Sequence, residues 1–233
     1  MSGWSAVRWT GVLGLASIVA QLAGAIAGSV AGTVPAFDDP NKILAFAKDQ
    51  HLALTSVSVL FIIGFTLFIG FLAGLRAIAA TAAPHHEWLA TAMFGAGIAI
   101  TLIALVQPGL ALAADAIAVS NHADAAQVRL IFEVETMLGG APWLVPSAFF
   151  LGAAGSLGAV TKILPHWLAL AGWIGSVIAL IASFASYGGS DPKAFWSGNG
   201  LVTILAFLPY WVWTVGASVV FLRRKESAAS LHP

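Results

Sequence analysis

Residues 50–75 read QHLALTSVSVLFIIGFTLFIGFLAGL and contain no aspartate, glutamate, lysine or arginine. The hydrocarbon core of a bilayer is about 30 Å thick and needs roughly 20 apolar residues of helix to cross it. This stretch is therefore long enough to span a membrane once. Five further stretches of similar length also lack charged residues: 9–37, 88–114, 136–161, 163–190 and 194–222.

The pattern predicts an all-α protein, an integral membrane bundle of six transmembrane helices. Hydrophobic residues make up 59% of the chain and charged residues only 9%, far below the roughly 25% of a soluble domain. We expect one domain, 1–226, followed by a short polar tail, 227–233. The predicted helices cover approximately 10–34, 51–75, 88–113, 136–160, 166–187 and 200–222.

The charges between the stretches predict an orientation. Assigning the gaps alternately to two sides places six basic and two acidic residues on the side of the termini, and four basic and eight acidic residues on the other. Cytoplasmic loops are enriched in lysine and arginine. We therefore predict a multi-pass protein of the cell membrane with both termini in the cytoplasm, and we call the opposite side the outer side.

The fourth helix is expected to be irregular. Asp124 can cap a helix that runs to Met137, after which Gly139, Gly140, Pro142 and Pro146 interrupt the pattern. Proline removes a backbone donor, so we predict a kink or a break between Gly139 and Pro146. The segment 124–138 would then be an outer amphipathic extension, which either lies on the membrane surface or continues the helix at an angle.

The positions of the glycine and tryptophan residues predict close helix contacts and the location of the membrane interface. Glycines at spacings of three and four suggest close helix contacts within the bundle, especially between the fourth and fifth helices, which hold Gly155 and Gly172. Most tryptophans lie near predicted helix ends, where indole prefers the headgroup layer. For Tyr210, Trp211 and Trp213 we prefer this anchoring role over an aromatic cage for a cationic ligand.

One segment resembles a known family. Residues 164–175, LPHWLALAGWIG, follow a short charged loop and open the fifth helix. They resemble the "lP-x-W-L-x-x-x-G-x-I-G" segment of the bacterial multi-pass membrane family called domain of unknown function 4386. The resemblance implies a six-helix fold over nearly the whole chain but no activity. Many members carry a glutamate in helix 2 and an Arg/Glu pair in helix 3, and here those helices contain no charge.

Two polar residues near or within the predicted spans need an explanation. His51 begins the second helix and shares a helical face with Thr55, so it can carry a proton or ligate a metal. Since no second histidine lies three or four residues away, we favour an interfacial role and predict no metal site. We expect Gln21, midway along the first helix, to form a hydrogen bond to another helix and not to a substrate.

Arg129 and Glu133 share one helical face, and Glu135 lies on another, where the apolar run of the fourth helix begins. Charges buried in a membrane usually mark function, although here we favour a solvated face on an interfacial helix. By elimination, any functional polar site should lie in the outer half of the bundle, around His51, Asp115, Arg129, Glu133 and Glu135. Such a site requires Glu133 or Glu135 to turn inward and meet His51 or Arg129.

The sequence leaves three functional classes open. No catalytic, nucleotide or metal motif is present, so we predict no catalytic residues and no cofactor, and no nucleic acid among the partners. The class we favour is an accessory or structural protein that contacts lipid and another membrane protein or a second copy of itself. The alternatives are a small transporter or ligand-binding bundle, and a membrane enzyme acting on a lipid or quinone.

Overall fold

The computed structural model describes residues 5–189, 194–198 and 200–224, and the predicted tail 227–233 lies outside them. Within this part of the chain the regular elements are all helical. They are α1 (Ala6–Ala31), α2 (Pro40–Asp49), α3 (His51–Ala82), η1 (Pro84–His86), α4 (Glu87–Ala118), α5 (Ala125–Leu138), α6 (Ala141–Thr161), α7 (His166–Ser183), η2 (Phe184–Gly188), α8 (Leu201–Ala206) and α9 (Leu208–Arg223).

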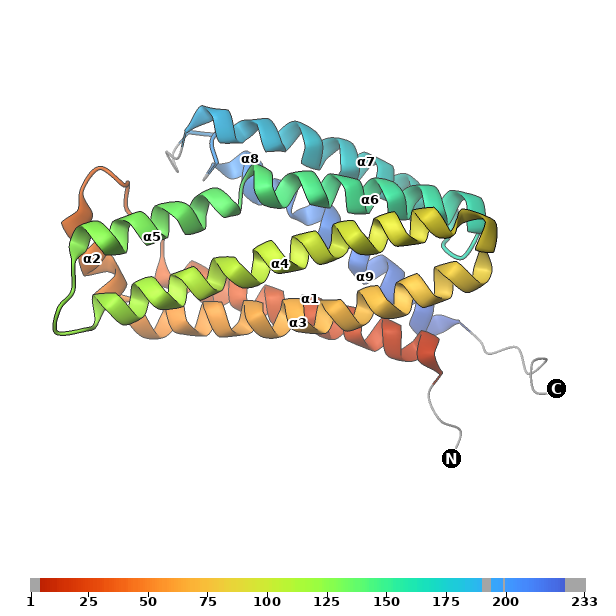
Figure 1. Ribbon diagram of the computed structural model, residues 1–233, viewed down its shortest axis with the longest axis horizontal. Helices are drawn as coiled ribbons and strands as arrows, with labels where there is room; N and C mark the ends of the chain where they lie inside the picture. Colours follow the sequence, from red (N-terminus) through yellow and green to blue (C-terminus); the bar gives the residue numbers. More distant parts are fainter. Residues whose placement is uncertain (1–4, 190–193, 199, 225–233) are drawn as a thin grey trace.

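The long helices run up and down along one axis (Figure 1). α1 begins and α9 ends at the same end of the bundle, while α2 and the turn from α4 to α5 lie at the other end. α1 packs along α3, α3 along α4, α4 along α6 and α6 along α7, and α9 closes the bundle against α1 and α7. The end that carries α2 is the outer end of the sequence-based orientation.

Six helical segments are long and apolar enough to cross a membrane: 6–31, 51–82, 84–118, 125–161, 166–188 and 201–223. Large apolar side chains such as Ile26 and Phe149 remain exposed on the outside of the bundle. Helices that are apolar on all faces are typical of membrane spans. The fold is thus the predicted six-helix bundle of a multi-pass membrane protein.

α3 and α4 are longer than the charge-free stretches that predicted them. Each has 32 residues, which corresponds to about 48 Å of helix. α3 continues through Arg76 to Ala82, and α4 extends beyond Asp115 to Ala118. A charged residue marks the edge of an apolar span but does not end a helix, so the two helices reach beyond a 30 Å hydrocarbon layer.

The predicted break in the fourth helix is confirmed. α5 ends at Leu138, α6 begins at Ala141, and Gly139 and Gly140 lie between them. Asp124 caps α5 by accepting hydrogen bonds from the backbone N–H groups of Ala126 and Gln127. Pro146, in contrast, lies inside α6.

α5 packs as an extension of the bundle. Its buried face joins α2 and the end of α4 in a small second core of Ile43, Ala47, Ala114, Ala118, Val128 and Phe132. α2 was not predicted, and it is an amphipathic helix whose Ile43 and Ala47 are fully buried. Of the two arrangements left open for 124–138, the structure has the one in which the segment continues the fourth helix outward.

A second break was not predicted. The sequence suggested one continuous helix over 200–222, whereas α8 ends at Ala206 and α9 begins at Leu208, with Phe207 between them. Pro209 lies in the first turn of α9 and has no N–H to donate to the carbonyl group of Leu205. The α-helical hydrogen-bond ladder cannot be complete across this position.

The main core is aromatic, and it corrects part of the membrane-anchoring prediction. Trp143, Tyr210 and Trp213 are buried, at most 1% exposed, and pack with Phe68 and Phe150. These side chains lie inside the bundle and not in a headgroup layer. Their places along the chain did not indicate this, because a position in the sequence does not say which way a ring faces.

α6 and α7 pack closely, as predicted. A Cβ atom on Gly155 would lie 2.7 Å from the carbonyl oxygen of Ala169, and one on Gly172 would lie 2.8 Å from that of Leu151. Only glycine permits this approach of two backbones.

Candidate functional site

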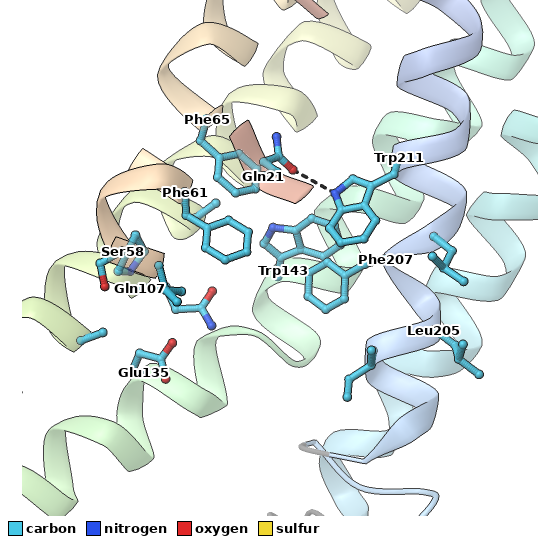
Figure 2. A pocket seen from close by; sticks show the side chains of 16 residues that line it. Gln21, Ser58, Phe61, Phe65, Gln107, Glu135, Trp143, Leu205, Phe207 and Trp211 are labelled. Carbon is cyan, nitrogen blue, oxygen red and sulfur yellow. Dashed lines mark hydrogen bonds between the residues drawn. The ribbon is translucent and has the colours of Figure 1, made fainter. Parts of the chain in front are cut away.

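A cavity of about 310 Å³ lies between the helices, in the half of the bundle away from the termini. Its size is at the lower end of the range for small-molecule sites. Apolar side chains form most of its wall, and four polar side chains join them (Figure 2). The lining residues are Gln21, Val57, Ser58, Phe61, Phe65, Ala104, Gln107, Pro108, Ala111, Glu135, Trp143, Ile204, Leu205, Phe207, Leu208 and Trp211.

Both broken helices border this cavity. Glu135 precedes the Gly139–Gly140 break and Trp143 follows it, while Phe207 is itself the second break. The rings of Trp143 and Phe207 meet with their centroids 4.1 Å apart, so the two breaks are in contact. Membrane transporters commonly build their sites from discontinuous helices of this kind.

A proline in α4 adds a third irregularity to the wall. Pro108 lies inside the helix and cannot donate a hydrogen bond to the carbonyl group of Ala104, four residues earlier. Both residues line the cavity. One turn of the helix that borders the cavity thus contains a carbonyl group, that of Ala104, without its usual helical donor.

Gln21 holds α1 against α9 at one side of the cavity. Its Oε1 accepts a hydrogen bond from Trp211 Nε1 at 3.0 Å, and its Nε2 donates to Ser17 Oγ at 2.9 Å and to Tyr210 Oη at 3.4 Å. Gly64 of α3 leaves the space for this side chain, because a Cβ there would lie 2.8 Å from Gln21 Cγ. The predicted helix-to-helix hydrogen bond is confirmed, and it also fixes a residue of the cavity wall.

Glu135 lies at the other side. It is partly buried, lines the cavity, and its carboxyl group meets the side-chain amide of Gln107. Figure 2 shows the ring of Phe61 between this carboxyl group and Gln21, with the rings of Trp143 and Phe207 to one side, towards Trp211. Among the residues that line the cavity, Glu135 is the one with an ionisable acidic or basic side chain.

His51, Thr55 and Asp115 form a separate cluster. His51 Nδ1 lies 2.7 Å from Asp115 Oδ2, and Thr55 Oγ1 donates to the same oxygen at 2.8 Å. The side chain of Asp115 is 3% exposed and that of His51 is 40% exposed. Asp115 lies one helical turn beyond Ala111 of the cavity wall, so this cluster is on the outer side of the cavity.

Arg129 and Glu133 form a third group. The guanidinium Nη2 of Arg129 lies 3.0 Å from Glu133 Oε2, as their spacing on one helical face predicts. Both side chains are partly exposed. This pair is not among the residues that line the cavity.

The structure therefore separates the five residues suggested by elimination. His51 meets Asp115, Arg129 meets Glu133, and Glu135 turns towards the cavity and Gln107. No histidine, aspartate or glutamate cluster in the described ranges has the three members that a metal ion would require. The aromatic wall was missed, because Trp143 and Trp211 were assigned to the membrane interface. The glycine pair at 139–140 was the signal that pointed to this region.

Comparisons with protein-family models, with curated proteins and with solved structures find no match to this chain.

Proposed function

We propose that this chain is a small-molecule-binding membrane protein, of the transporter or ligand-binding type, whose site is the cavity between its two broken helices. The observation that supports this proposal is the convergence of both breaks, Glu135, Gln107 and Gln21 on one cavity of ligand size. A mainly apolar wall with a few fixed polar groups is typical of small-molecule sites. We infer a ligand that is largely apolar and carries one polar group.

This proposal departs from the accessory role that the sequence favoured. That preference rested on the absence of charge inside the first three helices. In the structure, the side chain of Glu135, near the end of α5, lines a cavity. The first three membrane-spanning helices, α1, α3 and α4, contribute Gln21, Ser58 and Gln107 to the wall of the same cavity. The resemblance to the family of domain of unknown function 4386 stays a prediction, and it implies no activity that would compete with this proposal.

Native mass spectrometry of the chain purified with its surrounding membrane tests the proposal. Ala111→Phe places a ring in the cavity, whereas Ala113→Phe, two residues along the same helix, places one on an exposed face outside the cavity wall. A small molecule should remain bound to the unaltered chain and to Ala113→Phe but be absent from Ala111→Phe. Identical bound species in all three would contradict the proposal.

A further inference from the structure

The cavity brings together several aromatic rings and one carboxyl group that has no ion-pair partner among the described residues. In the described part of the chain Glu135 makes no ion pair, since the nearby Arg129 binds Glu133. The amide of Gln107 is neutral and supplies no counter-charge. A carboxylate withdrawn from water is costly unless a positive charge or a proton balances it.

No group in the wall can provide that positive charge. The other polar side chains that line the cavity are Gln21, Ser58 and Gln107, all of them neutral. A proton or the ligand itself can supply the positive charge that balances the buried part of this carboxyl group.

The aromatic wall favours a ligand with a positive charge. Phe61, Phe65, Trp143, Phe207 and Trp211 line the same cavity as Glu135. The face of an aromatic ring carries partial negative charge and attracts ammonium groups, most strongly when water is excluded. Trp211 is held in place by its hydrogen bond to Gln21, so its ring needs little rearrangement to meet a ligand.

The charges on the outer side of the bundle also favour a cationic ligand. Eight of the ten acidic residues lie on the outer side of the predicted topology, with four basic residues. A negative potential at the mouth of a site raises the local concentration of cations.

We propose that the cavity binds a lipophilic monovalent cation, a substituted or quaternary ammonium compound, with its charge between Glu135 and the nearest aromatic rings and its apolar part against the rest of the wall. This inference rests on the proposed function, because it names the ligand class of the same cavity. The Glu135 carboxylate selects for positive charge, and the aromatic rings select for the shape of the ligand. An apolar anion would meet the Glu135 carboxylate and is disfavoured.

Two probes of nearly equal shape test the charge requirement. Phenyltrimethylammonium and tert-butylbenzene differ in charge but hardly in volume. Their binding to the chain in lipid nanodiscs is measured by equilibrium dialysis, with protein-free nanodiscs of the same composition to subtract partition into lipid. The unaltered chain should bind the cation about tenfold or more tightly than the neutral probe. Equal binding of both probes would overturn the proposal.

Two matched variants locate the charge. Glu135→Gln should weaken binding of the cation about tenfold or more and leave the neutral probe unchanged, which also reports that the cavity is intact. Glu133→Gln removes a carboxylate two residues away that does not line the cavity, so it should change either affinity less than about twofold. If both variants bind the cation alike, the proposal fails.

The outcomes separate this inference from the proposed function. If both probes bind equally and Ala111→Phe abolishes the binding, the cavity is a ligand site for a different class of compound. If neither probe binds, the cation proposal is overturned. The proposed function is then tested separately, by whether native mass spectrometry finds a small molecule that the unaltered chain retains and Ala111→Phe loses. The two-probe comparison needs no variant, so it holds even if Glu135→Gln fails to fold.

Discussion

His51 Nδ1 lies 2.7 Å from Asp115 Oδ2, and this contact joins the first turn of α3 to the last turn of α4. Thr55 donates to the same carboxylate oxygen, while Asp115 Oδ1 is buried with no hydrogen-bond partner among the described residues. The buried carboxyl group therefore depends on two side chains of α3. These two contacts hold α3 against α4 at the outer end of the bundle, beside the cavity.

Loss of either partner should destabilise the fold. Thr55→Val removes one hydrogen bond and should lower stability by about 1 kcal/mol. His51→Ala should cost more, because it removes the packing of the imidazole ring as well as the shorter of the two contacts to the buried carboxyl group. Thermal unfolding in detergent measures both, with His85→Ala in an exposed turn as the control. If His51→Ala unfolds at the same temperature as His85→Ala, Asp115 does not depend on the histidine.

The close contact of α6 and α7 predicts opposite effects for two glycine substitutions. Gly172→Ala places a Cβ 2.8 Å from the carbonyl oxygen of Leu151, so it should lower stability by about 1–3 kcal/mol. Gly95 on α4 has open space around it, and Gly95→Ala should raise stability by about 0.5–1 kcal/mol. Thermal unfolding of the two variants under one condition provides the comparison. A loss of similar size in both would show that backbone contact between α6 and α7 is not the cause.

The first helix break is tied to η2 through one hydroxyl group. Ser186 Oγ accepts a hydrogen bond from the backbone N–H of Ala141 at 2.9 Å, and a Cβ on Gly140 would lie 2.7 Å from the same oxygen. Gly140→Ala should displace Ser186 and leave the Ala141 N–H unpaired, at a cost of about 1 kcal/mol.

The matched variant Ser186→Ala tests this explanation. It removes the same hydrogen bond without adding a methyl group at 140, so its loss of stability should be similar. Because both changes act on one contact, the double variant should be little less stable than either single one. Additive losses in unfolding measurements would mean that Gly140 is required for a different reason.

The orientation of the bundle can be read from chemical labelling. The chain has no cysteine, so single cysteines at Asn121 and Glu87 provide clean labels at exposed positions of opposite ends. If the termini are cytoplasmic, as the charge distribution predicts, a membrane-impermeant maleimide should label Asn121→Cys but not Glu87→Cys in intact cells. The reverse labelling pattern would require the opposite orientation.

Much of the fold could be predicted from the sequence, because exclusion of charge from an apolar helix is a strong constraint. The break at Gly139–Gly140 was visible since two consecutive glycines weaken a helix. The break at Phe207 was not, because proline is an ambiguous signal. Pro108 and Pro146 lie within continuous helices, whereas Pro209 follows a break.

The candidate site could be predicted only in part. The cavity lies in the outer half of the bundle, where the sequence placed any polar site, and Glu135 was among the residues suggested. Its partners were not predictable, because the pairing of Glu135 with Gln107 depends on how α5 packs against α4. The places of Trp143 and Trp211 in the cavity wall likewise depend on how the helices pack. Sequence position alone assigned both residues to the membrane interface.

Occupancy of the cavity in the native membrane is the central claim, and photo-crosslinking measures it most directly. Benzoylphenylalanine in place of Phe207 would put a photoreactive group in the cavity wall, and in place of Phe149 it would put one on the exposed outer surface of α6. After irradiation of intact cells, the Phe149 position should gain only lipid masses in intact-protein mass spectra. The Phe207 position should gain a distinct small-molecule mass that Ala111→Phe removes. Identical lipid adducts at both positions, unaffected by Ala111→Phe, would contradict the account.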